Sequence, residues 1–192
     1  NENSTYGRYR TPIRIVGTTT IHARSFDENQ AVSKVVTKKF TKVKPWKATA
    51  LHQYSLGELT QHMYKVDWDE LLDFSTITPE QTKTVSSVSP LEEEFVALVI
   101  DGFLYINSTN MIEFALASDD GSRLLIDDNV VIDNGGLHGT QEKRGAAPLS
   151  KGWHKISVEW FNKAGGADLH LRMGVLGDAM HSIASSSFAT RK

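Results

Sequence analysis

Two adjacent aspartates, Asp119 and Asp120, are the residues whose type and spacing best fit a chemical role. They precede Gly121-Ser122 and an apolar run that is typical of a strand. Because neighbouring carboxylates repel each other and aspartate is depleted in strands, we expect the pair at a turn. Such a turn either leaves the carboxylates in solvent or provides a cation or hydroxyl groups for them to hold. The pair therefore indicates a binding face rather than a catalytic pocket.

Short alternating segments surround this pair and predict the elements that position it. Apolar residues alternate with polar ones in each of them, which is the pattern of half-buried strands. Turn residues separate the segments. The continuous apolar run Phe95–Ile100 predicts a strand that is covered on both faces, and Gly102 is expected to end this strand. The segments are 111–117, 124–126, 130–132, 156–160 and 169–173. This spacing predicts an all-β fold, an antiparallel β-sandwich.

Strand direction gives the loops a location, because consecutive antiparallel strands end alternately at opposite rims. If the 111–117 strand runs upward, the loops at 119–121, 134–142 and 162–166 share the upper rim. The opposite rim carries no comparable polar set. The candidate binding residues at the upper rim are Asp119, Asp120, Asp133, Asn134, His138, Glu142 and Asn162.

Structural roles are the alternatives for the same residues. The aspartate pair can cap backbone N–H groups, with Arg123 neutralising one carboxylate. His138 can bond a neighbouring loop, and Asn162 can form a hairpin turn with Gly165-Gly166. Trp160 alternates with core residues and is expected to be buried, whereas Trp153 is the tryptophan expected to be exposed.

The chain divides into two predicted parts. Residues 1–42 contain three predicted strands, at 12–15, 18–26 and 32–40, which are too few to bury much core. Residues 43–49 are a predicted linker in which Trp46 docks on a neighbour, and residues 50–192 form the sandwich. Within the sandwich, residues 67–74 form either a short helix or a loop with Trp68 and Phe74 packed inward.

Composition excludes several classes of function. The 192 residues are 40% hydrophobic, which is enough for a packed core, and the formal net charge is −2. This charge is not that of a nucleic-acid-binding protein. The absence of cysteine excludes thiol catalysis and zinc ribbons, and no apolar run is long enough to span a membrane. The sequence has no signal-peptide pattern at its start, and we interpret it as a fragment of a longer protein.

Several motifs, in order, resemble the protective-antigen-type β-sandwich domain. They are 114–134, Gly136-Leu137-His138-Gly139, Glu159-Trp160-Phe161-Asn162 and Gly165-Gly166-Ala167. That domain occurs in bacterial toxins, in yeast flocculins and adhesins, and as an accessory module of glycosidases. The resemblance implies glycan binding, with Asp119, Asp120, Asn134, His138 and Asn162 as the contact residues.

In the adhesin branch of that family, two adjacent aspartates joined by a cis peptide hold a calcium ion that ligates sugar hydroxyls. Asp119 and Asp120 occupy the matching positions, and Asn134 is the candidate third ligand on rim geometry. The chain departs from the adhesins at Gly121-Ser122, so their third ligand does not transfer directly. The resemblance thus implies calcium as the possible cofactor.

The N-terminal residues resemble another module, the fibronectin-type-III-associated strands near the C-terminus of bacterial β-hexosaminidases. The matching segments are 10–13, 18–26 and 33–36. Together the resemblances imply a non-catalytic, carbohydrate-binding accessory region of a bacterial glycoside hydrolase. Its partners would be an oligosaccharide and the catalytic domain of the same polypeptide. The protein would be secreted, periplasmic or located on the cell surface. The rival functions are a structural spacer on the catalytic domain and an adhesin-like protein-binding module.

Overall fold

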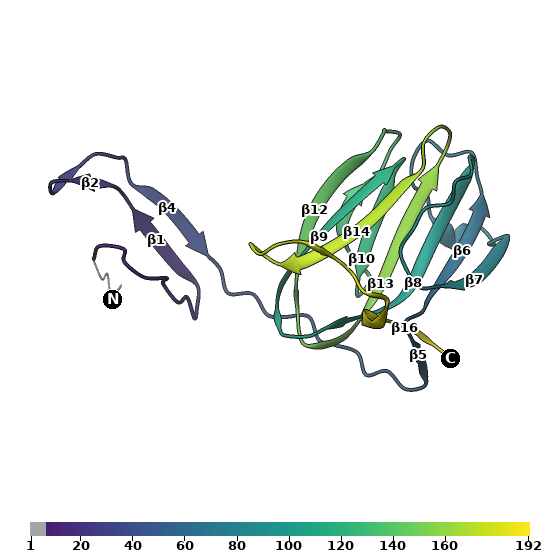
Figure 1. Cartoon of the computed structure of the whole chain (residues 1–192), viewed down its shortest axis with the longest axis horizontal. Coiled ribbons are helices and arrows are strands. Elements are labelled where there is room, and N and C mark those ends of the chain that lie inside the picture. The colour runs from purple at the N-terminus through teal and green to yellow at the C-terminus, as the bar shows by residue number, and fades with distance from the viewer. Residues whose placement is uncertain (1–6) are drawn as a thin grey trace. The chain divides into compact units, whose positions relative to one another are not determined.

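A computed structural model describes residues 7–192. The chain divides into two compact units, whose boundary in the sequence lies between Lys44 and Pro45. The first six residues of the predicted N-terminal module lie outside the described residues. Each unit is described by itself (Figure 1).

The N-terminal unit is built of two small ladders. Strand β1 (Thr19–Ala23) pairs antiparallel with β4 (Val36–Phe40), and β2 (Phe26–Asp27) pairs with β3 (Gln30–Ala31). The strand predicted at 12–15 is wrong, because that segment has no ladder partner. No residue between 7 and 44 is buried, as expected for so few strands.

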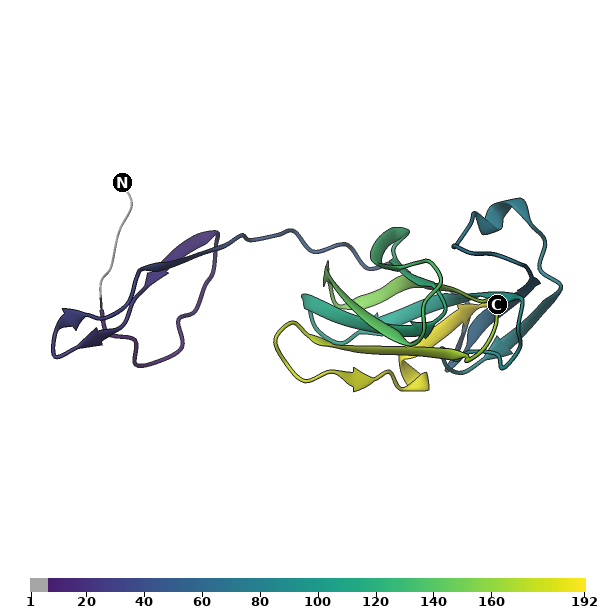
Figure 2. The same ribbon diagram turned by 90° about the horizontal axis from the view of Figure 1, so that it is seen from above.

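The larger unit is a sandwich of two antiparallel sheets, which confirms the predicted fold class (Figure 2). The smaller sheet has the strand order β12-β9-β14-β15, with bounds β9 Asn110–Asp119, β12 Gln141–Leu149, β14 Asp168–Val175 and β15 His181–Ser182. The larger sheet has eight strands: β5 Tyr54–Leu56, β6 Leu59–Lys65, β7 Gln81–Val85, β8 Val96–Ile106, β10 Ser122–Ile126, β11 Asn129–Asn134, β13 Gly152–Asn162 and β16 Phe188–Arg191.

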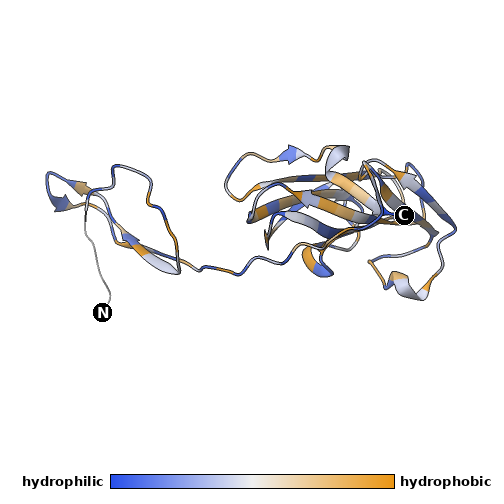
Figure 3. Cartoon of the chain, turned by 90° about the horizontal axis from the view of Figure 1, so that it is seen from below, coloured by the Kyte–Doolittle hydropathy of each residue, from blue (hydrophilic) through white to orange (hydrophobic). Residues whose placement is uncertain are grey.

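The core lies between the two sheets. Apolar and polar residues alternate along the strands, which Figure 3 shows as changing colour along each ribbon. Phe114 and Leu116 of β9 face Trp160 of β13 and Leu124 of β10 within one buried cluster. Trp46 packs against this cluster, and its backbone N–H donates to the Pro148 carbonyl oxygen at 2.7 Å.

Two local predictions changed in the structure. Gly102 does not break its strand, because β8 continues through it, and a Cβ there would lie 2.5 Å from Leu59 Cδ2. Residues 67–74 form the predicted loop alternative, and the short 3₁₀ turns are η1 (Phe74–Thr76) and η2 (Ser185–Ser187). Trp68 and Phe74 pack with Tyr64 over the outer side of the larger sheet.

Candidate binding rim

Three loops meet at one end of the sandwich, as strand direction predicted. They follow β9 (119–121), β11 (135–140) and β13 (163–167), and we call these residues the rim. The Asp120 carboxylate joins all three, because Oδ1 accepts the His138 N–H at 3.1 Å and Oδ2 accepts the Lys163 N–H at 3.0 Å. Asp120 is only 6% exposed. Two charge-assisted hydrogen bonds to backbone amides thus satisfy this buried carboxylate.

Asp119 has a different environment. The peptide bond between Asp119 and Asp120 is cis, and the Asp119 carbonyl oxygen accepts the indole N–H of buried Trp160 at 3.0 Å. The Asp119 carboxylate lies beside two glycines. A Cβ on Gly166 would be 3.2 Å from Asp119 Oδ2, and one on Gly139 would be 4.0 Å away. The glycines leave space beside the carboxylate that a side chain would fill.

Charge accumulates at Asp119. Partial burial, the Asp120 charge and the Asp168 charge all raise its pKa, while His138 and a hydrogen bond from the Thr140 backbone lower it. Asp168 is the partner of Asp119 in the ladder of β9 and β14. The predicted neutralisation by Arg123 is wrong, because the Arg123 guanidinium donates to Glu159 at 2.9 Å. The site therefore favours a cation or hydroxyl donors.

Asn134 lies directly beneath the rim. Its side chain is fully buried, and its Nδ2 donates to Ser118 Oγ at 3.1 Å and to the Gln141 carbonyl oxygen at 3.0 Å. Ser118 Oγ in turn is 2.7 Å from Ser122 Oγ. Asn134 Oδ1 has no hydrogen-bond partner, although it is buried. A buried acceptor without a donor is uncommon and is expected to have a partner such as an ion or water.

The His138 ring contacts carbonyl oxygens of its own loop, not of a neighbouring loop as predicted. Nε2 is 2.9 Å from the Asn134 carbonyl oxygen, and Nδ1 is 2.9 Å from the Gly139 carbonyl oxygen. Its backbone N–H is the donor to Asp120. The structure therefore places His138 at the rim, half-buried, with a loop-bracing role alongside any contact to a ligand.

Asn162 ends β13, directly before the third rim loop, and its side chain faces inward. It is 1% exposed, and its Nδ2 donates to the Glu93 carbonyl oxygen at 2.9 Å, while Oδ1 has no partner. This contact connects the end of β13 to the segment before β8. Of the remaining rim candidates, Asp133 Oδ1 accepts the Gly135 N–H, and Glu142 pairs with Arg144 and Arg172.

Sequence reasoning missed two contributors to the site, Asp168 and Gly166. Asp168 lies just before the predicted 169–173 strand, and the register places it opposite Asp119. The end of the 111–117 strand and the start of the 169–173 strand lie at the same rim. Pairing these two strands antiparallel would have placed Asp119 near Asp168. Gly166 was assigned to a turn, and its closeness to the Asp119 carboxylate has no signature in the sequence.

The rim and the buried residue beneath it carry oxygen atoms of the kind that calcium prefers as ligands. They are the carboxylates of Asp119 and Asp120 and the unpaired Asn134 Oδ1. Within residues 7–192, no cluster of three or more His, Cys, Asp or Glu side chains is arranged to hold a metal ion. A carboxylate oxygen that accepts one hydrogen bond keeps a second lone pair, so these residues fit a calcium ion in chemical type.

A cavity of about 470 Å³ lies beside the outer side of the larger sheet. Its lining includes Trp68, Thr78 and Glu80. Lys163, whose backbone N–H donates to Asp120, also contacts the 67–74 loop that carries Trp68. Its Nζ is 2.5 Å from Asp69 Oδ1.

In the part of the chain that the structure describes, no helix is long and apolar enough to cross a bilayer.

Comparisons with known proteins agree on one domain type. The family model described as "PA14 domain" matches residues 75–182. The PA14 domain of the antifreeze protein MpAFP is 13% identical, with a TM-score of 0.64, covering 74% of this chain and 95% of that one. A PA14 sugar-binding domain from an RTX adhesin is 14% identical, with a TM-score of 0.60 over 72% and 100% of the two chains.

A third solved structure is the A domain of epithelial adhesin 9 from Candida glabrata, in complex with Galβ1-3GlcNAc. It is 9% identical, with a TM-score of 0.58, and the match covers 76% of this chain and 94% of that chain. No curated protein is significantly similar to this sequence. The matches thus support the fold across most of the chain.

Proposed function

The chain belongs to the PA14 domain family, and on that basis we propose that its larger unit binds glycans through the rim. The observation that carries this proposal is the contrast between the two aspartates. Asp120 binds the three loops together, whereas the Asp119 carboxylate lies beside glycines with space next to it. Similar folds with low identity bind sugars according to their descriptions, namely the RTX adhesin domain and epithelial adhesin 9.

We further propose calcium as the cofactor of this site. Asp119, Asp120 and Asn134 would hold the ion, with loop carbonyl oxygens and water completing its six to eight oxygen ligands. Bound calcium supplies a positive charge that coordinates sugar hydroxyls. The support is the raised pKa of Asp119, caused first by burial and then by Asp120, together with the unpaired Asn134 oxygen.

The parent protein is proposed to be a secreted or surface-located bacterial glycoside hydrolase of the β-hexosaminidase type. In that protein, the chain would be a non-catalytic accessory region that holds the catalytic domain on its glycan. The N-terminal unit would be part of a fibronectin-type-III-associated module. These proposals rest on the order of the sequence motifs.

A structural spacer is the second candidate, and one observation favours it. The N-terminal unit exposes large apolar side chains, with Val16 at 71% and Val36 at 67%. In a spacer, a neighbouring domain would cover these side chains. An adhesin-like module that binds protein is the third candidate.

A glycan array, run with calcium and with a chelator, tests the first proposal. We expect binding by the wild-type chain and loss of binding by Asp119→Ala. Asp178→Ala is the matched control, since Asp178 is an exposed aspartate beyond β14, at the opposite end of the sandwich. If neither the wild-type chain nor the control binds any glycan, the binding function is wrong. If binding persists in the chelator, calcium is not the cofactor.

A further inference from the structure

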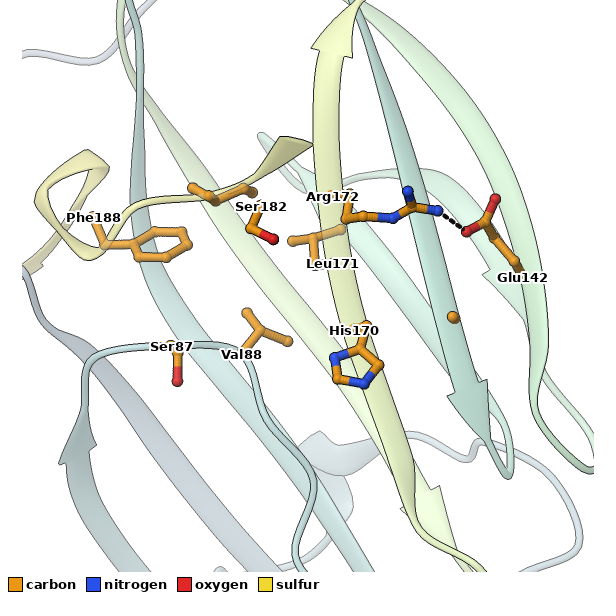
Figure 4. Close-up of a pocket in the computed structure, with 10 residues that line it drawn as sticks. Ser87, Val88, Glu142, His170, Leu171, Arg172, Ser182 and Phe188 are labelled. Atoms are coloured by element: carbon orange, nitrogen blue, oxygen red, sulfur yellow. Dashed lines mark hydrogen bonds and ion pairs between the residues drawn. The ribbon is translucent and has the colours of Figure 1, made fainter. Parts of the chain in front are cut away.

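A groove of about 380 Å³ runs along β14, with Ala117, Glu142, His170 and Arg172 on the outer side of the smaller sheet and apolar residues at the sheet edge. In Figure 4, His170 and Arg172 project from β14 on either side of Leu171, and Val88 and Phe188 lie across the open space. Its lining therefore combines apolar side chains with charged ones, which is the composition of sites that bind small organic ligands.

The strand register places this groove next to the rim. Asp168 pairs with Asp119, and two residues further along the same ladder His170 pairs with Ala117. Since side chains two residues apart point to the same face, Ala117 and Asp119 lie on one side of β9, about 7 Å apart along the strand. Ala117 also lines the groove, so the groove begins two residues along β9 from Asp119 and on the same side of that strand.

The charges along the groove are not balanced. Glu142 accepts from Arg144 at 3.0 Å and also from Arg172, so two guanidinium groups share one carboxylate. The hydrogen bond from Arg172 is the largest cause that lowers the pKa of Glu142. At the other wall, His170 Nε2 is 2.9 Å from Asp168 Oδ1. One positive charge at the Arg144–Glu142–Arg172 cluster is therefore without an anionic partner among these residues.

We propose that the groove is a second subsite of the rim, which takes a negatively charged sugar unit of the same glycan. The anion would pair with Arg172, and the sugar ring would lie over Ala117 beside His170, which share the outer side of the sheet with Arg172. This inference rests on the proposed glycan binding at Asp119 and adds to it the class of ligand, an acidic oligosaccharide. Carboxylated and sulfated sugars share the chemistry that Arg172 recognises, because both accept paired hydrogen bonds from a guanidinium.

Matched pairs of immobilised oligosaccharides test this subsite with the whole chain. Uronic acid oligomers are compared with their methyl esters, and sulfated oligomers with their desulfated forms, so that only the charge changes. We expect the wild-type chain to bind the charged member about tenfold more tightly in at least one kind of pair. The kind that shows the preference identifies the anion. The preference should weaken as salt is added.

Three variants locate the effect. Arg172→Gln should remove the preference, because binding of the charged member weakens far more than binding of the neutral member. Lys143→Gln is the matched control, because Lys143 alternates with Glu142 and Arg144 along β12 and donates to the Asp133 carbonyl oxygen instead. Ala117→Leu keeps every charge and should weaken binding of the charged member by filling the groove. Melting temperatures establish that each variant is folded.

The outcomes separate this subsite from glycan binding itself. If the wild-type chain binds no glycan, the function proposed for the rim is wrong and the subsite with it. If it binds glycans but treats both members of every pair alike, only the acidic subsite is overturned. Equal losses in Arg172→Gln and Lys143→Gln would also overturn it, because the preference would then reflect net charge rather than the groove.

Discussion

Asp120 and Lys163 are 43 residues apart in the sequence, yet the Asp120 carboxylate accepts the Lys163 backbone N–H at 3.0 Å. The other oxygen of the same carboxylate accepts the His138 N–H. One buried side chain thus determines the relative positions of three loops. Asp119, the neighbouring residue, accepts a backbone hydrogen bond from Thr140 and lies beside Gly139 and Gly166.

Asp120→Asn should destabilise the larger unit by about 2 kcal/mol. Asparagine keeps one acceptor, but its amide NH₂ group faces an N–H donor where the second carboxylate oxygen was. Urea denaturation of the variant and of an Asp178→Asn control measures the difference. Equal stability of the two variants would show that Asp120 does not hold the loops together.

Asp119→Asn should have the opposite effect on the ligand-free chain. Burial first, and then Asp120, raise the pKa of Asp119 above its ordinary value of 3.8. Between the pKa of the unfolded state and the higher pKa of the folded state, the folded chain binds more protons than the unfolded chain. The free energy of unfolding therefore falls as pH rises through this window. The variant lacks this loss and should melt at a higher temperature at neutral pH.

Melting curves recorded in chelator, from about pH 3.5 to pH 7, measure this dependence on both chains. The difference between variant and wild type should grow as pH rises and then become constant. A variant that is less stable than the wild-type chain at every pH would contradict the prediction. The same variant should show no calcium-dependent rise in melting temperature.

Gly166→Ala should block the site without unfolding it. The new methyl group would lie 3.2 Å from Asp119 Oδ2, where a ligand of that carboxylate would approach. We expect glycan affinity to fall at least about tenfold, with less than about 1 kcal/mol change in stability. Gly139→Ala is the graded control, because its methyl group would be 4.0 Å away. Unchanged affinity in Gly166→Ala would place the ligand elsewhere.

His154→Leu should separate stability from binding. This histidine is fully buried far from the rim, with Nδ1 2.7 Å from Asp127 Oδ2 and Nε2 2.9 Å from the Ser150 carbonyl oxygen. Leucine would remove both of these polar contacts of a buried side chain, which should cost about 3 kcal/mol in urea denaturation. Glycan affinity, measured below the unfolding transition, should not change. A parallel loss of affinity would show that the two ends of the sandwich are coupled.

Alternation in the sequence was sufficient to predict the sandwich and the meeting of its loops. Phe114, Leu116 and Trp160 are buried as their spacing predicts, because a strand's side chains point to opposite faces in turn. The N-terminal unit was less predictable. Its residues 12–15 alternate in the same way but form no ladder, since an alternating pattern needs a partner strand before it becomes a sheet.

The individual site residues were less predictable than the rim. Asn134 and Asn162 are polar and lie in or beside loops, which led to their prediction as ligand contacts, yet both are buried braces with hydrogen bonds to carbonyl oxygens. Their ligand role stays a prediction. Burial depends on which chain segments cover a residue. The carbonyl oxygens of Gln141 and Glu93 come next to Asn134 and Asn162 only when the chain folds.

The sequence by itself determined the periodicity, and through it the fold class and the end of the sandwich at which Asp119 and Asp120 lie. The tertiary structure alone decided how the two aspartates divide their roles. Identical side chains at adjacent positions have the same local chemistry, so only the long-range neighbours can distinguish them. The N–H groups of His138 and Lys163 bind Asp120, whereas Asp119 lies between Gly139, Gly166 and the facing Asp168.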